Sequence, residues 1–321
     1  MRFNAEREEK SRGRRSKLQP TYNDATVGFV TVVDRGRFTV ALDFDTHGPR
    51  FVYAIKSRNL GRKGVLVGDY VKLVGDISGT KDTLARIVEI EQRATVLRRT
   101  SDDADSDEKP IVANAEVVAI VQALQNPEPR IRFIDRCIVA SLSEGIEPIV
   151  VLTKSDLASD KDIRSILEGM SVRVFTVNKT DGHKELLSFL HDKITVFIGH
   201  SGVGKSTLVN AITSATQVTS EVNDVTGRGR HTTTAAFAIQ LATGGWIIDT
   251  PGVRGFGLGH INADDVIEFF EDLVPGTKDC PRGCKHIDAD CALDTWVANE
   301  SIHTSRLDSL RRLLSSLTSE I

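Results

Sequence analysis

The chain has 321 residues, of which 40% are hydrophobic and 26% are charged. This composition is ordinary for a folded protein of two or three domains and argues against disorder throughout. The longest apolar runs, 117–124 and 146–152, are too short to span a bilayer, and the N-terminus is charged rather than signal-like. We therefore expect a cytoplasmic protein without a membrane span.

The net charge of −3 hides an asymmetry along the chain. Residues 1–100 contain 20 Lys and Arg against 12 Asp and Glu, whereas residues 101–321 contain 21 against 32. A basic module joined to an acidic one predicts that the first part contacts a polyanion such as RNA. Residues 1–22 are rich in Arg and Lys and lack apolar periodicity, which predicts a flexible basic arm.

Short β-branched runs separated by Gly and Asp fill residues 23–100 and predict five strands. These strands are expected at 26–33, 38–42, 51–55, 69–74 and 85–90. Five strands at this spacing predict a small barrel, and a basic surface fits an oligonucleotide-binding (OB) fold that grips RNA. Phe38, Phe51, Tyr53 and Tyr70 have rings able to stack on bases, but aromatic residues in short strands belong more often to the core. The sequence assigns none of them as a base platform.

An acidic run of small residues predicts a linker at 101–110. Beyond it, over 111–259, apolar runs alternate with helical stretches, which is typical of a mostly parallel sheet with crossover helices. The strands of this α/β module are expected at 117–121, 149–152, 172–175, 194–198 and 246–248.

The first chemical motif of this module is Thr153-Lys154-Ser155-Asp156, directly after the strand at 149–152. Its position allows the Asp156 carboxylate to accept hydrogen bonds from guanine N1–H and N2–H while the Lys154 stem packs on the base. Adenine offers no such pair of donors, and a site built on buried hydrogen bonds discriminates strongly against a ligand that lacks them. The motif predicts GTP rather than ATP.

A phosphate-binding loop follows, between the strand at 194–198 and a helix predicted over 205–212. Strand, glycine-rich loop and helix are the context that this motif requires. The loop N–H groups face the β-phosphate at the helix N-terminus, Lys205 reaches the β and γ oxygens, and the Ser206 hydroxyl binds Mg²⁺. The predicted contact residues are Gly199, His200, Ser201, Gly202, Val203, Gly204, Lys205, Ser206 and Thr207.

The third motif, 249–252, reads Asp-Thr-Pro-Gly and ends the last predicted strand. Asp249 is placed to hold Mg²⁺ through water, and the Gly252 N–H is placed to face the γ-phosphate. The preceding stretch 227–234 is glycine-rich and ends in hydroxyls, one of which should complete the Mg²⁺ shell. We favour Thr233 for this role, with Thr232 next.

The order of these motifs is unusual, because the guanine-reading motif precedes the phosphate loop. An ordinary GTPase has the reverse order, so the sequence predicts a circular permutation. The chain consequently leaves the nucleotide-binding module just after the γ-phosphate sensor, and residues 260–321 are connected directly to it.

Residues 260–321 contain a compact cluster of metal-ligand types. Four cysteines without an export signal argue against a disulfide framework. Three thiolates and one imidazole form a closed ligand set typical of structural Zn²⁺, which can stabilise a small module by about 10 kcal/mol. We expect a helical zinc domain whose ligands are Cys280, Cys284, His286 and Cys291. Cys137 lies in an apolar stretch and is predicted to be a buried thiol.

These motifs, in this order after a basic barrel and before the pattern C-x₃-C-x-H-x₄-C, closely resemble the ribosome small subunit-dependent GTPase A family. The resemblance implies a circularly permuted GTPase with an N-terminal OB domain and a C-terminal zinc domain. It also implies a role in late maturation of the small ribosomal subunit, with rRNA binding and with GTP hydrolysis stimulated by that subunit.

Three features depart from the family pattern. Thr153 replaces a commoner Asn, which weakens the connection between the base-reading motif and the phosphate loop, although a hydroxyl can still bond. The guanine-backing Ser-Ala-Lys is matched by Val177-Asn178-Lys179, which makes Val177 and Asn178 the corresponding nucleotide contacts. The metal-ligand spacing is shorter by one residue in two gaps.

The residue after Gly252 is Val253, where many GTPases place a water-orienting Gln. We therefore expect slow intrinsic hydrolysis. Our hypothesis is that a partner remodels 227–234 and brings His231, or an external group, toward the attacking water. A loop histidine that contacts RNA is an equally good interpretation of His231.

The leading hypothesis is a monomeric GTPase that acts as a timed assembly factor on the small ribosomal subunit and its rRNA. One alternative is a kinase-like enzyme that uses the same phosphate loop. Another is an RNA-binding protein whose nucleotide site only stabilises the fold.

Overall fold

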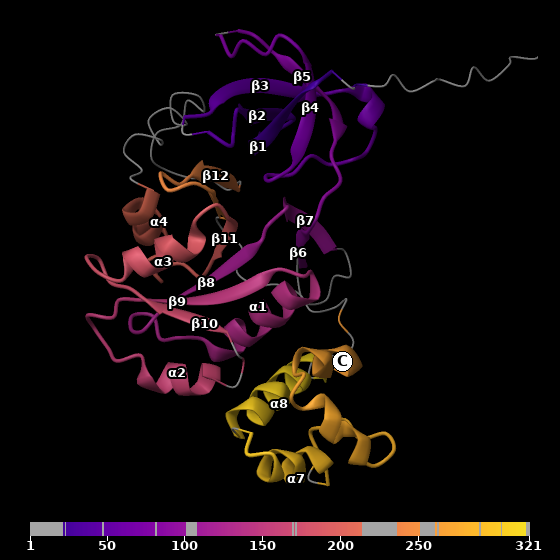
Figure 1. Ribbon diagram of the computed structural model, residues 1–321, viewed down its shortest axis with the longest axis vertical. Coiled ribbons are helices and arrows are strands. Elements are labelled where there is room, and N and C mark those ends of the chain that lie inside the picture. The colour runs from indigo at the N-terminus through magenta and orange to yellow at the C-terminus, as the bar shows by residue number, and fades with distance from the viewer. Residues whose placement is uncertain are drawn as a thin grey trace, which may run out of the picture.

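The computed structural model describes most of the chain (Figure 1). The described residues are 22, 24–46, 48–80, 82–100, 108–168, 170, 172–213, 236–250, 261, 263–288, 290–302 and 304–318. Residues 1–21 of the predicted basic arm, most of the acidic linker, the stretch 227–234 and Gly252 lie outside these residues. The roles predicted for His231, Thr232, Thr233 and Gly252 therefore stay predictions.

The N-terminal part is a closed five-stranded barrel, as predicted. Its strands are β1 (Thr26–Asp34), β2 (Arg37–Leu42), β3 (Arg50–Lys56), β4 (Tyr70–Gly75) and β5 (Ala85–Ile90), with a 3-10 turn η1 (Arg58–Leu60) after β3. The sheet closes because β1 pairs with both β2 and β4, and β3 runs parallel to β5. Alternate residues such as Val40, Val52 and Ile87 fill the interior. This is the Greek-key order of an OB barrel.

The barrel aromatics are divided between two environments. Phe38 is 5% exposed and belongs to the barrel core. Phe51 and Tyr70 pack instead against the core cluster that joins the barrel to the rest of the chain and that includes Phe29. The Phe29 ring lies 5.4 Å from Tyr70 and 4.8 Å from Trp246 of the α/β module. Tyr53 is half-buried on the outside of β3.

A two-stranded ribbon connects the barrel to the α/β module. It consists of β6 (Val96–Thr100) and β7 (Glu108–Ala113), paired antiparallel. Residues 108–110 of the predicted linker thus belong to a strand, because β6 offers them a pairing partner that the sequence pattern did not reveal. The side chain of Asn114, just after β7, donates to Gly68 O at 2.8 Å and fastens the ribbon to the barrel.

The α/β module supplies six strands, in the order β10-β9-β8-β11-β13-β12, to an eleven-stranded sheet that continues from β12 into β1 of the barrel. The six strands are β8 (Val117–Ala123), β9 (Glu147–Thr153), β10 (Arg173–Thr176), β11 (Ile194–Ile198), β12 (Phe237–Gln240) and β13 (Trp246–Asp249). All pairings among them are parallel except that of β12 with β13. The carboxyl ends of β9, β11 and β13 therefore meet at one edge, where ligands bind in sheets of this kind.

Helices cover both faces of this sheet, because its strands carry apolar side chains on both faces, as β11 illustrates. Ile194, Val196 and Ile198 belong to one core cluster, and Phe197 belongs to the other. The first cluster packs under α1 (Ile131–Ser143) and the second under α3 (His183–Leu190) and α4 (Lys205–Thr213). Helix α2 (Lys161–Glu168) follows β9. Strand residues buried on both faces read as continuous apolar runs, which is why these strands were predictable.

The C-terminal module is helical, as predicted. It comprises α6 (Ala263–Val266), η2 (Ile267–Phe269), η3 (Val274–Asp279), α7 (Ala292–Asn299) and α8 (Thr304–Thr318). Helix α8 lies against α1 and α2 (Figure 1), and its Leu310 shares a core cluster with Ile134 and Cys137 of α1. Cys137 is fully buried, as predicted, and burial raises the pKa of its thiol. Among the described residues, no helix combines the length and apolarity needed to cross a membrane.

Candidate active site and metal centre

The phosphate loop follows β11 in the predicted context. Gly202 and Gly204 adopt left-handed φ angles of 85° and 89°, and a Cβ on Gly199 would lie 2.6 Å from Val121 O. Only glycine meets these demands without strain. The loop turns directly into α4, so its N–H groups lie at a positive helix end suited to a phosphate.

The charged groups of the phosphate site lie next to one another. Lys205 Nζ contacts Asp249 Oδ1, and both side chains are about nine-tenths buried, with 11% and 10% exposed. Asp249 is the last residue of β13, so the sheet brings this carboxylate to the first turn of α4. Ser206 follows Lys205 in that turn and is exposed. The roles predicted for Asp249 and Ser206 as Mg²⁺ ligands stay predictions, and the third predicted ligand lies outside the described residues.

A cavity of about 300 Å³ lies beside the phosphate loop, at the ends of β9 and β10. It is lined by Thr153, Lys154, Asp156, Leu157, Val177, Asn178, Lys179, His183, Gly204, Thr207, Leu208 and Ala211. The structure therefore brings the guanine-reading motif, the 177–179 segment and the start of α4 around one space. Its position next to the phosphate loop suits a purine base.

Sequence reasoning missed several residues of this cavity. Leu157 follows Asp156 and is 49% exposed, and a large exposed apolar side chain beside a base-reading carboxylate was a usable signal. Ala211 lies one helical turn after Thr207, so helical spacing pointed to it. His183 carried no motif signal, because only the fold brings the first turn of α3 to the cavity.

Thr153 connects the base-reading motif to the phosphate loop. Its Oγ1 donates to Val203 O at 2.5 Å and lies 3.3 Å from Gln122 O. The hydroxyl thus makes the bond between the two motifs that we expected it to retain in place of Asn. Lys154 has a left-handed φ of 59°, and its Nζ donates to Asn126 O.

Asn178 lines the cavity but has a structural task as well. Its Oδ1 accepts hydrogen bonds from Thr180 N at 2.9 Å, Thr180 Oγ1 at 3.1 Å and Asp181 N at 2.8 Å. The hydrogen bonds that the Asn178 amide oxygen accepts therefore stabilise the conformation of the loop after β10. Ser155 N donates to Val177 O at 3.3 Å, which ties this loop to the guanine-reading motif.

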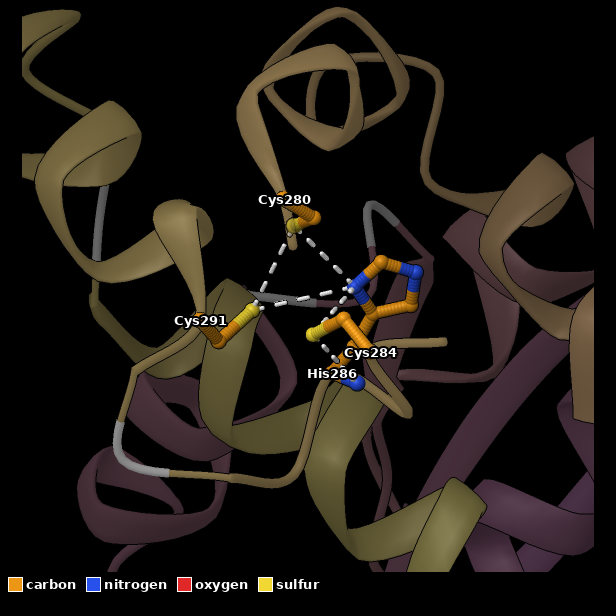
Figure 2. Close-up of side chains that lie close together, drawn as sticks. All are labelled: Cys280, Cys284, His286 and Cys291. Carbon is orange, nitrogen blue, oxygen red and sulfur yellow. Dashed lines mark hydrogen bonds between the residues drawn. The ribbon is translucent and has the colours of Figure 1, made fainter. Parts of the chain in front are cut away.

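The four predicted metal ligands converge in the C-terminal module (Figure 2). Their ligand atoms all lie within 4.8 Å of one another. The His286 Nδ1 lies 3.6 Å from Cys280 Sγ and 3.7 Å from the Sγ atoms of Cys284 and Cys291. The Sγ atoms of Cys280 and Cys291 are 3.8 Å apart.

These distances can be compared with a tetrahedral zinc site. Bonds of about 2.3 Å to sulfur and about 2.05 Å to nitrogen give edges of about 3.8 Å between sulfurs and about 3.6 Å between sulfur and nitrogen. The Cys280–Cys291 separation and the three separations from His286 Nδ1 match these edges, so the ligand types and these distances fit Zn²⁺.

Hydrogen bonds around the cluster hold the backbone of the ligand His286 in place. His286 has a left-handed φ of 60°, and its carbonyl accepts a hydrogen bond from Arg311 Nε at 3.2 Å. Arg311 is in turn held by two bonds to the Asp294 carboxylate, of 2.9 and 2.6 Å. Burial raises the pKa of the Cys291 thiol to about 12, so a cation is required to hold this sulfur as a thiolate at neutral pH.

The fold and these sites define a circularly permuted P-loop GTPase. The chain belongs to the RsgA GTPase family, whose family model matches residues 90–259. The chain is 40% identical over 241 residues to the small ribosomal subunit biogenesis GTPase RsgA of Klebsiella pneumoniae (strain 342), covering 71% of this chain and 67% of that protein. It is 32% identical over 311 residues to the protein of the same name from Chlorobaculum parvum, covering 92% and 99%.

Two solved structures share the fold. YjeQ from Thermotoga maritima superposes with a TM-score of 0.69 at 24% identity, covering 91% of this chain and 98% of that one. YloQ, described as a circularly permuted GTPase, superposes with a TM-score of 0.68 at 23% identity, covering 94% and 97%. The predicted permutation, family and enzyme class are thereby confirmed.

Proposed function

We propose that this GTPase acts in late maturation of the small ribosomal subunit, that it binds the rRNA of the subunit, and that the subunit stimulates its hydrolysis of GTP. The observation that carries this proposal is the match to the Chlorobaculum parvum small ribosomal subunit biogenesis GTPase over 92% of this chain and 99% of that protein. A match of that extent includes the barrel and the C-terminal module as well as the nucleotide site.

The barrel is the proposed rRNA-binding part. Its strands and turns present exposed cations, including Arg35, Arg37, Arg58 and Arg86. A barrel of this fold holds a nucleic acid backbone on a basic surface, and the affinity of such contacts falls steeply with salt. The GTP-bound form is proposed to dock on the subunit through the barrel, the basic arm and the C-terminal module.

GTP hydrolysis is proposed to proceed through the groups assembled at the edge of the sheet. Lys205 binds the β and γ oxygens, and Asp249, Ser206 and Thr233 hold Mg²⁺, which neutralises the phosphate charge when bound. Asp156 selects guanine. The Gly252 N–H faces the γ-phosphate, and His231 is the proposed side chain that partner binding brings toward the attacking water.

The C-terminal module is proposed to hold one Zn²⁺ through Cys280, Cys284, His286 and Cys291, with a structural role. Metal analysis of the purified chain is expected to give about one zinc per molecule. Cys291→Ser should lose the metal, whereas Cys137→Ser, the matched change at the fourth cysteine, should retain it. Equal zinc content in the two variants would overturn this assignment.

The function is tested by steady-state hydrolysis of GTP and ATP with and without purified small ribosomal subunits, at two salt concentrations. We expect slow, GTP-selective turnover that rises many-fold with subunits, and a smaller rise at high salt. Preference for ATP would favour the kinase-like alternative. Undiminished support of subunit maturation by a folded Lys205→Ala variant would favour an RNA-binding protein with a structural nucleotide site.

A further inference from the structure

The phosphate loop has few side chains that can hold its conformation. Three of its six residues before α4, 199–204, are glycine, and the others are His200, Ser201 and Val203. Ser201 is exposed, whereas Val203 is buried in the core cluster under α3 and α4. The His200 ring instead packs on Phe133, which belongs to the core cluster under α1. The loop is therefore anchored to the clusters on both faces of the sheet.

The rings of His200 and Phe133 form a tilted aromatic pair. Their centroids are 4.4 Å apart and their planes meet at 49°. Phe133 is 9% exposed and His200 is half-buried, so most of this contact is shielded from water. Aromatic pairs in such arrangements contribute more to stability than their buried area alone.

The helix that carries Phe133 is itself held on two sides. At its start, Arg130 N donates to Oε1 of Gln122, a buried residue of β8, at 3.2 Å. Two residues after Phe133, Asp135 accepts a hydrogen bond from Arg312 of α8. Helix α1 is thus fixed both to the sheet and to the C-terminal module, and it offers a firm support to a loop that has few contacts of its own.

The segment before α1 lies against the same loop. A Cβ on Gly202 would lie 3.6 Å from Pro127 Cδ, which is ordinary van der Waals contact. The neighbouring Asn126 O accepts a hydrogen bond from Lys154 Nζ of the guanine-reading motif. Residues 126–133 therefore border the phosphate loop from Gly202 to His200.

A firm support matters because of what the loop has to do. Its N–H groups bind phosphate only when they point to one place, and glycine-rich segments lose more conformational freedom on ordering than others. Contacts that order such a loop before the ligand arrives reduce this cost and raise the affinity. The His200 ring supplies a contact of this kind at the start of the loop.

We propose that His200 is a positioning residue of the GTPase site. Its ring, packed on Phe133, holds the phosphate loop in the conformation that receives the nucleotide phosphates. The proposal rests on the predicted binding of these phosphates by the loop. Because the contact depends on a ring, phenylalanine should be able to replace His200, whereas a polar side chain without a ring should not.

The test measures the affinities of the full chain and its variants for GDP and IDP, by competition with a fluorescent GDP analogue. His200→Asn removes the ring, His200→Phe keeps one, and Phe133→Leu removes the partner ring. A double variant combines His200→Asn with Phe133→Leu. The matched control is Phe189→Leu on α3, because Phe189 is half-buried and also forms an aromatic pair, with Phe175 at 5.3 Å. Circular dichroism checks that each variant is folded.

We expect His200→Asn and Phe133→Leu each to weaken GDP about two- to tenfold, the change for one aromatic pair. IDP lacks the N2 amino group of the base, and its affinity should fall by the same factor, since the phosphate side of the site is affected. The double variant should bind no more weakly than the weaker single variant, because both changes remove one contact. His200→Phe should recover most of the affinity, and Phe189→Leu should stay within about twofold of the unmodified chain.

Three results would overturn the proposal. They are additive losses in the double variant, a loss in His200→Phe as large as that in His200→Asn, and a loss for GDP that IDP does not share. If Phe133→Leu does not fold, the comparison of His200→Asn with His200→Phe decides the question alone. Failure of the underlying premise is recognised separately: unchanged GDP binding in Lys205→Ala would refute phosphate binding by the loop itself.

Discussion

Arg312 of α8 donates from Nε to Oδ2 of Asp135 on α1 at 2.8 Å, across the contact between the C-terminal module and the GTPase sheet. Asp135 is 2% exposed, and Arg312 is held in place by a second bond to Ser309 Oγ at 2.8 Å. Burial raises the pKa of the Asp135 carboxyl, and Arg312 acts against that shift. A buried carboxylate thus depends on a cation supplied by another module, which couples the stability of the two.

Arg312→Met should destabilise the chain by about 3–5 kcal/mol, because it leaves the buried Asp135 charge without its partner. Urea unfolding followed by circular dichroism measures the loss. The control is Arg164→Met, which breaks the pair with Asp160 on α2, where Arg164 is 43% exposed. A surface pair of this kind is worth at most about 1 kcal/mol. Similar losses in the two variants would show that the buried pair is not specially important.

The loss in Arg312→Met should also depend on pH. The pKa of Asp135 is raised in the folded protein, so its protonated form favours folding, and this contribution is lost as the pH rises above the ordinary 3.8. Without Arg312 the pKa rises further. The gap in unfolding free energy between wild type and Arg312→Met should therefore be smaller at pH 5 than at pH 7.5. In an Asp135→Asn background, the gap between the chain with Arg312 and the Arg312→Met variant should not depend on pH, and persistence of that dependence would assign it to another group.

Thr153→Val should weaken GDP binding, because it removes the bond from Oγ1 to Val203 O while conserving shape. We expect a loss of about three- to tenfold, the change for one hydrogen bond, since the base-reading motif and the phosphate loop would then move independently. Thr153→Ser keeps the hydroxyl and should bind almost normally. Titration with a fluorescent GDP analogue measures both affinities, and equal losses would contradict a specific role for the hydroxyl, because Thr153→Ser retains it.

Metal removal should be visible in the fluorescence of Trp296. This side chain packs against Gly276, where a Cβ would lie 2.3 Å from Trp296 Cγ, and its Nε1 donates to Asp272 O at 3.0 Å. In a Trp246→Phe background, chelation should shift the Trp296 emission to the red, because a small module that folds around zinc loosens without it. The Trp246 emission of a Trp296→Phe variant should stay constant. An unchanged Trp296 signal after confirmed metal loss would indicate that the module folds independently of the metal.

Local sequence pattern was sufficient to predict the strands that are buried on both faces and the motifs that end parallel strands. It failed where a segment takes its structure from a distant partner. Strand β12 has four residues and was not predicted; it pairs with β1 at Val32 and Phe237, and its Gln240 side chain donates to Thr46 O at 2.8 Å. These partners are separated by about two hundred residues, so no local pattern predicts them. The cavity-lining position of His183 was missed for the same reason.

Thr195 offers a final test of how polar atoms are accommodated in this sheet. It is the second residue of the buried strand β11, and among the described residues its Oγ1 is the buried side-chain polar atom that has no hydrogen-bond partner. Burial of a hydroxyl without a hydrogen bond destabilises the folded state, because the desolvation penalty is not offset. Thr195→Val, which keeps the β-branched shape, should therefore stabilise the chain by about 1 kcal/mol in urea unfolding.

The matched control is Thr31→Val in β1 of the barrel. Thr31 is 1% exposed and also lies in a strand, but its Oγ1 donates to Thr39 O at 3.2 Å. The same substitution should there cost about 0.5–1.5 kcal/mol, because it removes a bond that is made. If the two identical substitutions change the unfolding free energy in opposite directions, the difference comes from the hydrogen bond, because both gain the same apolar surface. If Thr195→Val were instead destabilising, the Thr195 hydroxyl would be bonded in solution, and a buried water between β11 and its neighbouring helices would be the group to look for.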